Sequence, residues 1–105
     1  MSAVATFFND FLPKRLAENE DLGPTIGAAI QFDIEGAGTW TLDCREGQGK
    51  VVEGPVDEPG CIIATSAENW AQILQNPMMA TQFFMMGELT ATDLGLAMQL
   101  QNILG

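Results

Sequence analysis

The spacing of apolar residues in the first part of the chain is helical. Phe8, Leu12 and Leu16 recur every four residues, which predicts an amphipathic helix over residues 3–20. Pro13 lies inside this pattern, and proline removes a helical hydrogen bond and clashes with the preceding turn. We therefore expect Pro13 to kink this helix or to divide it into two pieces.

From Ile26 onwards, apolar residues recur at every second position. Apolar residues alternate with small or polar ones over residues 26–35, which predicts a half-buried strand. Further strands are expected at 39–44, 50–53 and 61–65. The first three strands are separated by short glycine-containing turns and should form a β-meander. Residues 54–60 hold two prolines and two glycines and must form a loop, and the nearly all-apolar strand after them should lie inside the sheet.

Helical signals return in the second half of the chain. Ser66 is a natural N-cap, and the helix that it begins should end at Asn76–Pro77. A short strand is expected at 89–92, followed by a last helix capped by Asp93. The order of elements predicts one α+β domain over residues 1–105, with helices packed on one face of the sheet.

The segment between these helices has an unusual composition. Residues 78–86 contain four methionines and two phenylalanines in nine positions, too many apolar side chains for one narrow helical stripe. Methionine is flexible, so it suits a surface that must fit varying shapes, although it also fills ordinary cores. A lipid-binding cavity and ordinary core packing are both compatible with this segment.

Charge narrows the choice of partners. The chain has 14 acidic and 4 basic residues, for a net charge of −10, and the bases form no cluster. Nucleic acids and anionic membranes require clustered Lys and Arg, so we expect neither as a partner. No apolar run approaches the ~20 residues that span a bilayer, so no stable membrane insertion is expected. The expected partner is a hydrophobic small molecule.

Few residues are suited to catalysis. The absence of histidine excludes imidazole zinc sites and histidine-based triads, and we expect neither a metal nor another cofactor. Cys44 and Cys61 lie in apolar strands, and we expect free structural thiols in the reducing cytoplasm. Asp33, Glu35 and Asp43 fall on the outer faces of neighbouring strands, where a solvated acidic surface or a carboxylate acid–base pair could result.

Three strings, in order, resemble one family. They are Thr39-Trp40-x-x-Asp43-x-x-x-Gly47-x-Gly49, then Cys61-x-Ile63 with Ser66-Ala67-Glu68-Asn69-Trp70, then Phe84-x-x-Gly87-x-Leu89 with Gly95-Leu96-Ala97-Met98-x-Leu100-Gln101-Asn102. Together they resemble the sterol carrier protein type 2 domain, and the resemblance extends over residues 3–104.

The resemblance implies a five-stranded, mostly antiparallel sheet whose helices enclose an apolar tunnel. Such domains bind sterols, fatty acids, fatty acyl-CoAs or phospholipids and are not themselves enzymes. Carried over by position, the tunnel would be lined by inward residues of the sheet and of the later helices. These are Phe32, Ile34, Trp40, Ile63, Trp70, Ile73, Leu74, Met78, Phe83, Phe84, Leu96, Met98 and Leu100.

An empty tunnel would be costly in so small a domain. A rigid void of ~400 Å³ would cost roughly 10 kcal/mol, comparable with the whole stability of a domain. The free protein should therefore partly collapse around methionine side chains or retain a lipid. Two alternatives stay open: an accessory protein-interaction domain with the same fold and a filled core, and a small enzyme that uses carboxylates.

Overall fold

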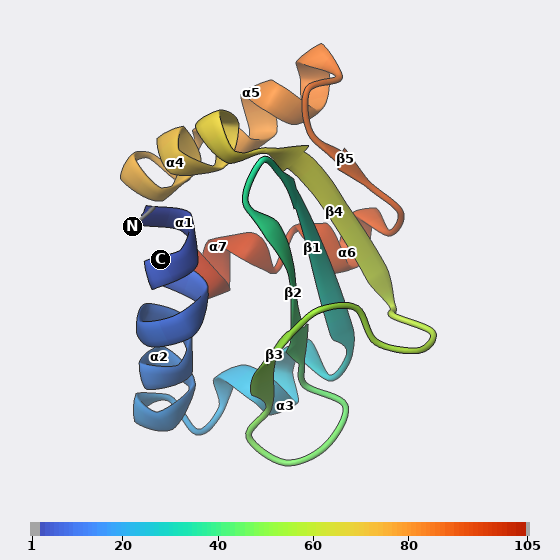
Figure 1. Cartoon of the computed structure of the whole chain (residues 1–105). Helices are drawn as coiled ribbons and strands as arrows, with labels where there is room; N and C mark the ends of the chain where they lie inside the picture. Colours follow the sequence, from blue (N-terminus) through green and yellow to red (C-terminus); the bar gives the residue numbers. More distant parts are fainter. Residues whose placement is uncertain (1–2, 105) are drawn as a thin grey trace.

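The computed structural model describes residues 3–104 and has helices at both ends of the chain with a sheet between them (Figure 1). The strands are β1 (Ala29–Glu35), β2 (Gly38–Asp43), β3 (Lys50–Glu53), β4 (Cys61–Ser66) and β5 (Thr90–Ala91). The helical segments are α1 (Ala3–Thr6), η1 (Phe7–Phe11), α2 (Leu12–Glu18), α3 (Leu22–Ile26), α4 (Ala67–Gln75), α5 (Met79–Met86), α6 (Leu94–Ala97) and α7 (Leu100–Leu104).

The five strands form one mixed sheet in the order β3-β2-β1-β4-β5. The predicted meander of β1, β2 and β3 is confirmed, and β4 lies inside the sheet as expected. Three of the four strand pairings are antiparallel, but β4 runs parallel to β1. Because parallel neighbours require a crossover, residues 54–60 cross the sheet to join β3 to β4 (Figure 1).

The side chains of β1 separate two faces. Ile30, Phe32 and Ile34 are almost fully buried in the apolar core that the helices complete. The opposite face carries the alternate positions, including the half-buried Asp33 and the exposed Glu35. The predicted α+β class, with helices packed on one face of the sheet, is confirmed.

The N-terminal helix is irregular next to Pro13, but it is not divided into two pieces. Residues 3–18 are helical without interruption, but residues 7–11 form a π-helical turn just before Pro13. The N–H of Leu12 bonds to the carbonyl of Phe7, five residues back. Since Pro13 has no N–H to continue the α-helical ladder, the wider π turn takes up the mismatch, and the helix is not divided into two pieces.

The predicted start of the first strand was wrong. Residues 22–26 form α3, which ends at Gly27 in the left-handed conformation with φ +62°, a conformation that glycine adopts without a steric penalty. The first strand therefore begins at Ala29. Ile26 fits the alternating pattern but is buried at the end of a helix. A single apolar residue is compatible with either a helix or a strand, and tertiary contacts decide which of the two is formed.

The predicted helix caps are confirmed, whereas the last helix is not continuous. Ser66 Oγ accepts a hydrogen bond from the N–H of Asn69 at 3.1 Å, and Asp93 Oδ1 accepts one from the N–H of Leu96 at 3.0 Å. After α6, the N–H of Gln99 bonds three residues back to the carbonyl of Leu96. This tighter turn separates α6 from α7, where we expected one helix.

Candidate functional site

An aromatic cluster fills the space between the sheet and the N-terminal helix. Phe8 of η1 stacks on Trp40 of β2, with centroids 4.8 Å apart, and on Trp70 of α4, with centroids 5.6 Å apart. Phe32 of β1 contacts Phe8 and Trp70 at 5.1 and 5.4 Å. We call Phe7, Phe8, Phe32, Trp40 and Trp70 the aromatic cluster; each member is at most 6% exposed.

Most of the predicted lining residues meet in one apolar core. Eight of the thirteen are buried in it: Phe32, Ile34, Trp40, Ile63, Trp70, Ile73, Phe83 and Leu100. Leu74 and Leu96 are half-buried and pack against it. The structure does not show an enclosed cavity among the described residues, so the tunnel and its lining stay predictions.

Three predicted lining residues lie at the surface instead. Met78 is 76% exposed, Met98 is 70% exposed and Phe84 is 41% exposed. In this structure they contribute little to the core, because they project from the outer sides of the α5 and α6 segments. Phe83, next to Phe84, is the one residue of α5 that is buried.

Sequence reasoning missed the contribution of the N-terminal helix to this site. Phe7 and Phe8 contact Trp70 directly, yet neither was among the expected lining residues. The four-residue spacing that begins at Phe8 correctly placed this residue on an apolar stripe. The spacing could not show that Phe8 would contact the indoles of Trp40 and Trp70, which lie 32 and 62 positions later in the sequence.

The C-terminal helices cover the core more loosely. Helix α5 buries only Phe83, and α6 has no buried residue. Met85 and Met86 at the end of α5 are 80% and 66% exposed, and Leu94 of α6 is 57% exposed. A helix that buries few side chains is held by little apolar contact area, so we expect α5 and α6 to move at a lower free-energy cost than α4, which buries Trp70 and Ile73.

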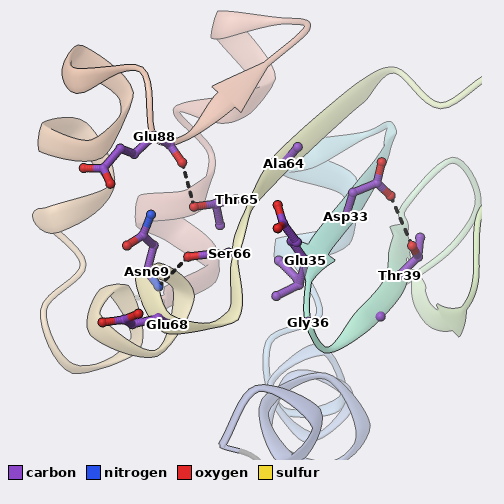
Figure 2. A pocket seen from close by; sticks show the side chains of 12 residues that line it. Asp33, Glu35, Gly36, Thr39, Ala64, Thr65, Ser66, Glu68, Asn69 and Glu88 are labelled. Carbon is purple, nitrogen blue, oxygen red and sulfur yellow. Dashed lines mark hydrogen bonds between the residues drawn. The ribbon is translucent and has the colours of Figure 1, made fainter.

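The three acidic residues considered for catalysis lie in two different places. Asp33 and Glu35 line an open depression of about 710 Å³ at the end of β1, together with Glu68 and Glu88 (Figure 2). Thr39 Oγ1 donates to Asp33 Oδ1 at 3.3 Å, and Gln31 Nε2 donates to the same atom at 3.0 Å. The described lining includes no basic side chain.

Asp43 lies at the other end of the strands, opposite Ala29, and is paired with Arg45. Two hydrogen bonds of 3.0 and 2.9 Å join the guanidinium to the Asp43 carboxylate, and they lower the pKa of Asp43. The three carboxylates that we considered as an acid–base group are therefore not brought together. Among residues 3–104, no group of three or more potential ligand side chains could hold a metal ion.

Both cysteines are buried, free thiols. Burial, with a smaller effect of the neighbouring Asp43 charge, raises the pKa of Cys44 to about 11. Cys61 Sγ lies 3.5 Å from the carbonyl oxygen of Asp93. A thiol whose pKa is raised is mostly protonated at neutral pH, so Cys44 is not an activated nucleophile.

Comparison with known proteins identifies the class to which this fold belongs. A sequence profile of the SCP-2 sterol transfer family matches residues 8–105. The chain therefore belongs to the SCP-2 sterol transfer family.

Curated relatives and solved structures agree with this assignment. The chain is 32% identical over 91 residues to hydroxysteroid dehydrogenase-like protein 2 of Xenopus tropicalis, covering 83% of this chain and 22% of the relative. It is 28% identical over 102 residues to human sterol carrier protein 2, covering 91% of this chain and 19% of the relative. The chain thus spans about a fifth of the length of these relatives.

Two solved structures show the same fold at 20% sequence identity. The sterol carrier protein domain 2 of Helicoverpa armigera superposes with a TM-score of 0.77 over 94% of this chain and 84% of that one. Palmitated SCP2L2 of Aedes aegypti superposes with a TM-score of 0.76 over 98% of this chain and 95% of that one. None of the helices described here is long and apolar enough to cross a membrane.

Proposed function

We propose that this chain is a lipid-binding module with no catalytic role of its own. Its membership of the SCP-2 sterol transfer family over residues 8–105 carries the proposal. The ligand would be a sterol, a fatty acid, a fatty acyl group or a phospholipid, held between the inner face of the sheet and the later helices. The two free thiols also lead us to propose a cytoplasmic location.

In this proposal, α5 and α6 act as an adaptable lid. They cover the core with few buried side chains, and their exposed methionines can repack against a ligand at low rotamer strain. Binding would open these segments and convert part of the collapsed core into a ligand site. The free protein then avoids the free energy of an empty cavity, which would rival the stability of the domain.

The net charge limits the cargo. With ten net negative charges and an acidic depression that no described basic residue lines, a polyphosphate head group such as that of acyl-CoA is disfavoured. Palmitate is a suitable first probe because a solved relative, Aedes aegypti SCP2L2, is described as palmitated.

The test combines native mass spectrometry of gently purified protein with thermal unfolding in palmitate and in a sterol. Ligand at ten times its Kd adds about 1.4 kcal/mol of stability. This should raise the Tm by about 6 °C in a domain of this size. Leu96→Gln, in the lid, should weaken binding about tenfold, and Gln82→Ala, at an exposed polar position of α5, should change it less than twofold. The proposal would be refuted if the purified protein retains no lipid and its Tm does not rise with either ligand.

The filled aromatic cluster favours a second candidate, an accessory interaction domain that binds no ligand. Phe8, Phe32 and Trp70 are fully buried, and their ring centroids lie 5.1 to 5.6 Å apart, as in a packed core. Under this alternative, neither palmitate nor a sterol changes the Tm, and the purified chain forms a stable complex with a protein. The ligand titration above therefore decides between the two candidates.

A further inference from the structure

Trp70 contains a buried donor with no acceptor. Its side chain is 0% exposed, and Nε1 is the one fully buried side-chain nitrogen or oxygen of the described residues that has no hydrogen-bond partner. The other indole, Trp40, is 5% exposed and donates from Nε1 to Asn9 Oδ1 at 3.3 Å. Most buried polar groups in native proteins are paired, so the unpaired Trp70 N–H requires an explanation.

Three aromatic rings pack against the indole of Trp70, whose Nε1 has no hydrogen-bond partner. Phe8 lies nearly parallel to the indole at 5.6 Å, Phe32 lies tilted at 5.4 Å, and Phe7 lies edge-on at 5.9 Å. A ring face is a far weaker acceptor than an oxygen atom. An oxygen brought to this place by a ligand would form a hydrogen bond that the free protein lacks, without breaking an existing one.

A line of aromatic rings joins this buried donor to the surface. Phe11 is 50% exposed and stacks on Phe7 with centroids 5.5 Å apart, and Phe7 in turn contacts Trp70. Phe7 and Phe11 are the two ends of the π-helical turn η1. Single π turns inside α-helices occur often at functional sites, and this one covers the unpaired indole.

We propose that Trp70 is a specificity residue, and that its Nε1 donates a hydrogen bond to the oxygen of a ligand that reaches the space between η1 and α4 after α5 and α6 have opened. The inference rests on the proposed lipid-binding function and names the ligand class: a long-chain or sterol-like molecule with an uncharged oxygen acceptor, such as a hydroxyl or an ester carbonyl. Phe7 and Phe11 would move aside together as the ligand enters.

The charges of the chain favour an uncharged acceptor. The four basic residues are Lys14, Arg15, Arg45 and Lys50. Arg15 bonds to the carbonyl of Asn102, and Arg45 pairs with Asp43. An ionised carboxylate beside Trp70 would therefore be buried among rings with no described cation in contact. Burying such a charge is unfavourable. A neutral hydroxyl or carbonyl loses less solvation free energy, and the hydrogen bond from the indole compensates for most of that loss.

The experiment compares 1-dodecanol with dodecane on the full chain and on two variants. Trp70→Phe keeps an aromatic ring but removes the donor, and Trp40→Phe is the matched control because Trp40 already has a partner. We expect Trp70→Phe to weaken 1-dodecanol binding about tenfold and to change dodecane binding less than twofold. Trp40→Phe should leave the ratio of the two affinities unchanged. The ratio is compared between variants, because the difference in solubility between the two ligands is the same for every variant and cancels in that comparison.

A second measurement does not depend on how the variants fold. In ¹⁵N–¹H spectra of the unsubstituted protein, the Trp70 indole proton should move downfield on addition of 1-dodecanol but not of dodecane. The Trp40 indole proton should hardly move with either ligand.

Three outcomes separate the hypotheses. If neither compound, nor palmitate, nor a sterol binds, the lipid-binding function itself fails. If both compounds bind but the Trp70 proton does not respond to the alcohol, the lipid-binding function stands and the role of Trp70 is refuted. A Trp70 proton that is already as far downfield as that of Trp40 in the free protein refutes the role as well.

Discussion

Phe8 is the ring on which the aromatic cluster depends, and its removal is the sharpest test of the structure. It is 0% exposed and contacts every other member of the cluster, with centroid distances of 4.8 to 5.6 Å. Phe8→Ala deletes the ring and leaves a gap between the two indoles and the sheet. We therefore predict a large loss of stability from this substitution.

The size of the loss follows from burial and from ring contacts. Truncation of a fully buried phenylalanine to alanine costs about 3–5 kcal/mol, and the stacked position of Phe8 places it near the upper end of this range. A domain of this length has a total stability of about 5–15 kcal/mol. Phe8→Ala should therefore lose a large share of the total stability and unfold at a clearly lower urea concentration.

Urea unfolding followed by tryptophan fluorescence measures this effect, because both indoles stack on Phe8 and report on its environment. Phe11→Ala is the matched control in the same π turn. Phe11 is 50% exposed and contacts one ring of the cluster, so its loss should cost less than about 1 kcal/mol. Equal losses for the two variants, or a loss below about 1 kcal/mol for Phe8→Ala, would show that the rings do not pack as described.

Three further predictions concern other parts of the chain. Phe83→Ala should cost about 3–5 kcal/mol in urea unfolding, whereas Phe84→Ala, at 41% exposure, should cost about 1 kcal/mol or less; the reverse order would contradict the orientation of α5. The pKa of Cys44 is raised from 9.0 to about 11. The protonated thiol therefore contributes stability below pH 9, and this contribution should be lost as the pH rises towards 11. Cys44→Ala should lack this decline, and an identical alkaline profile would exclude the thiol as its cause. Arg15→Gln should lose two hydrogen bonds to Asn102 O and speed amide exchange in α7 up to about tenfold; unchanged exchange would mean that this link does not hold α7.

The two ends of the core differ in how tightly they are packed. The N-terminal helix and α4 fix a dense aromatic cluster, while α5 and α6 bury a single side chain between them. A lid is useful only if it opens at lower free energy than global unfolding, and few buried contacts provide this property. In the two proposals, α5 and α6 provide the movement that admits a ligand, and Trp70 of α4 provides the specificity.

The sequence by itself determined the class of the fold and much of its order. Period-two alternation predicted the meander, and Ser66 and Asp93 were correctly identified as helix caps, because these signals act over a few neighbouring residues. Ten of the thirteen lining residues that the family resemblance implied lie in or against one core, and their role as a ligand lining stays a prediction.

Only the tertiary structure decided the remaining features. Ile26 fits a strand pattern but ends a helix, and Pro13 leads to a π turn where a kink or a break was expected. The unpaired N–H of Trp70 is likewise invisible in the sequence, since it depends on which rings from η1 and β1 pack against the indole. Local patterns record the preferences of the backbone and the average burial of a face. Which side chains meet, and which donor is left without an acceptor, depends on contacts between residues distant in sequence.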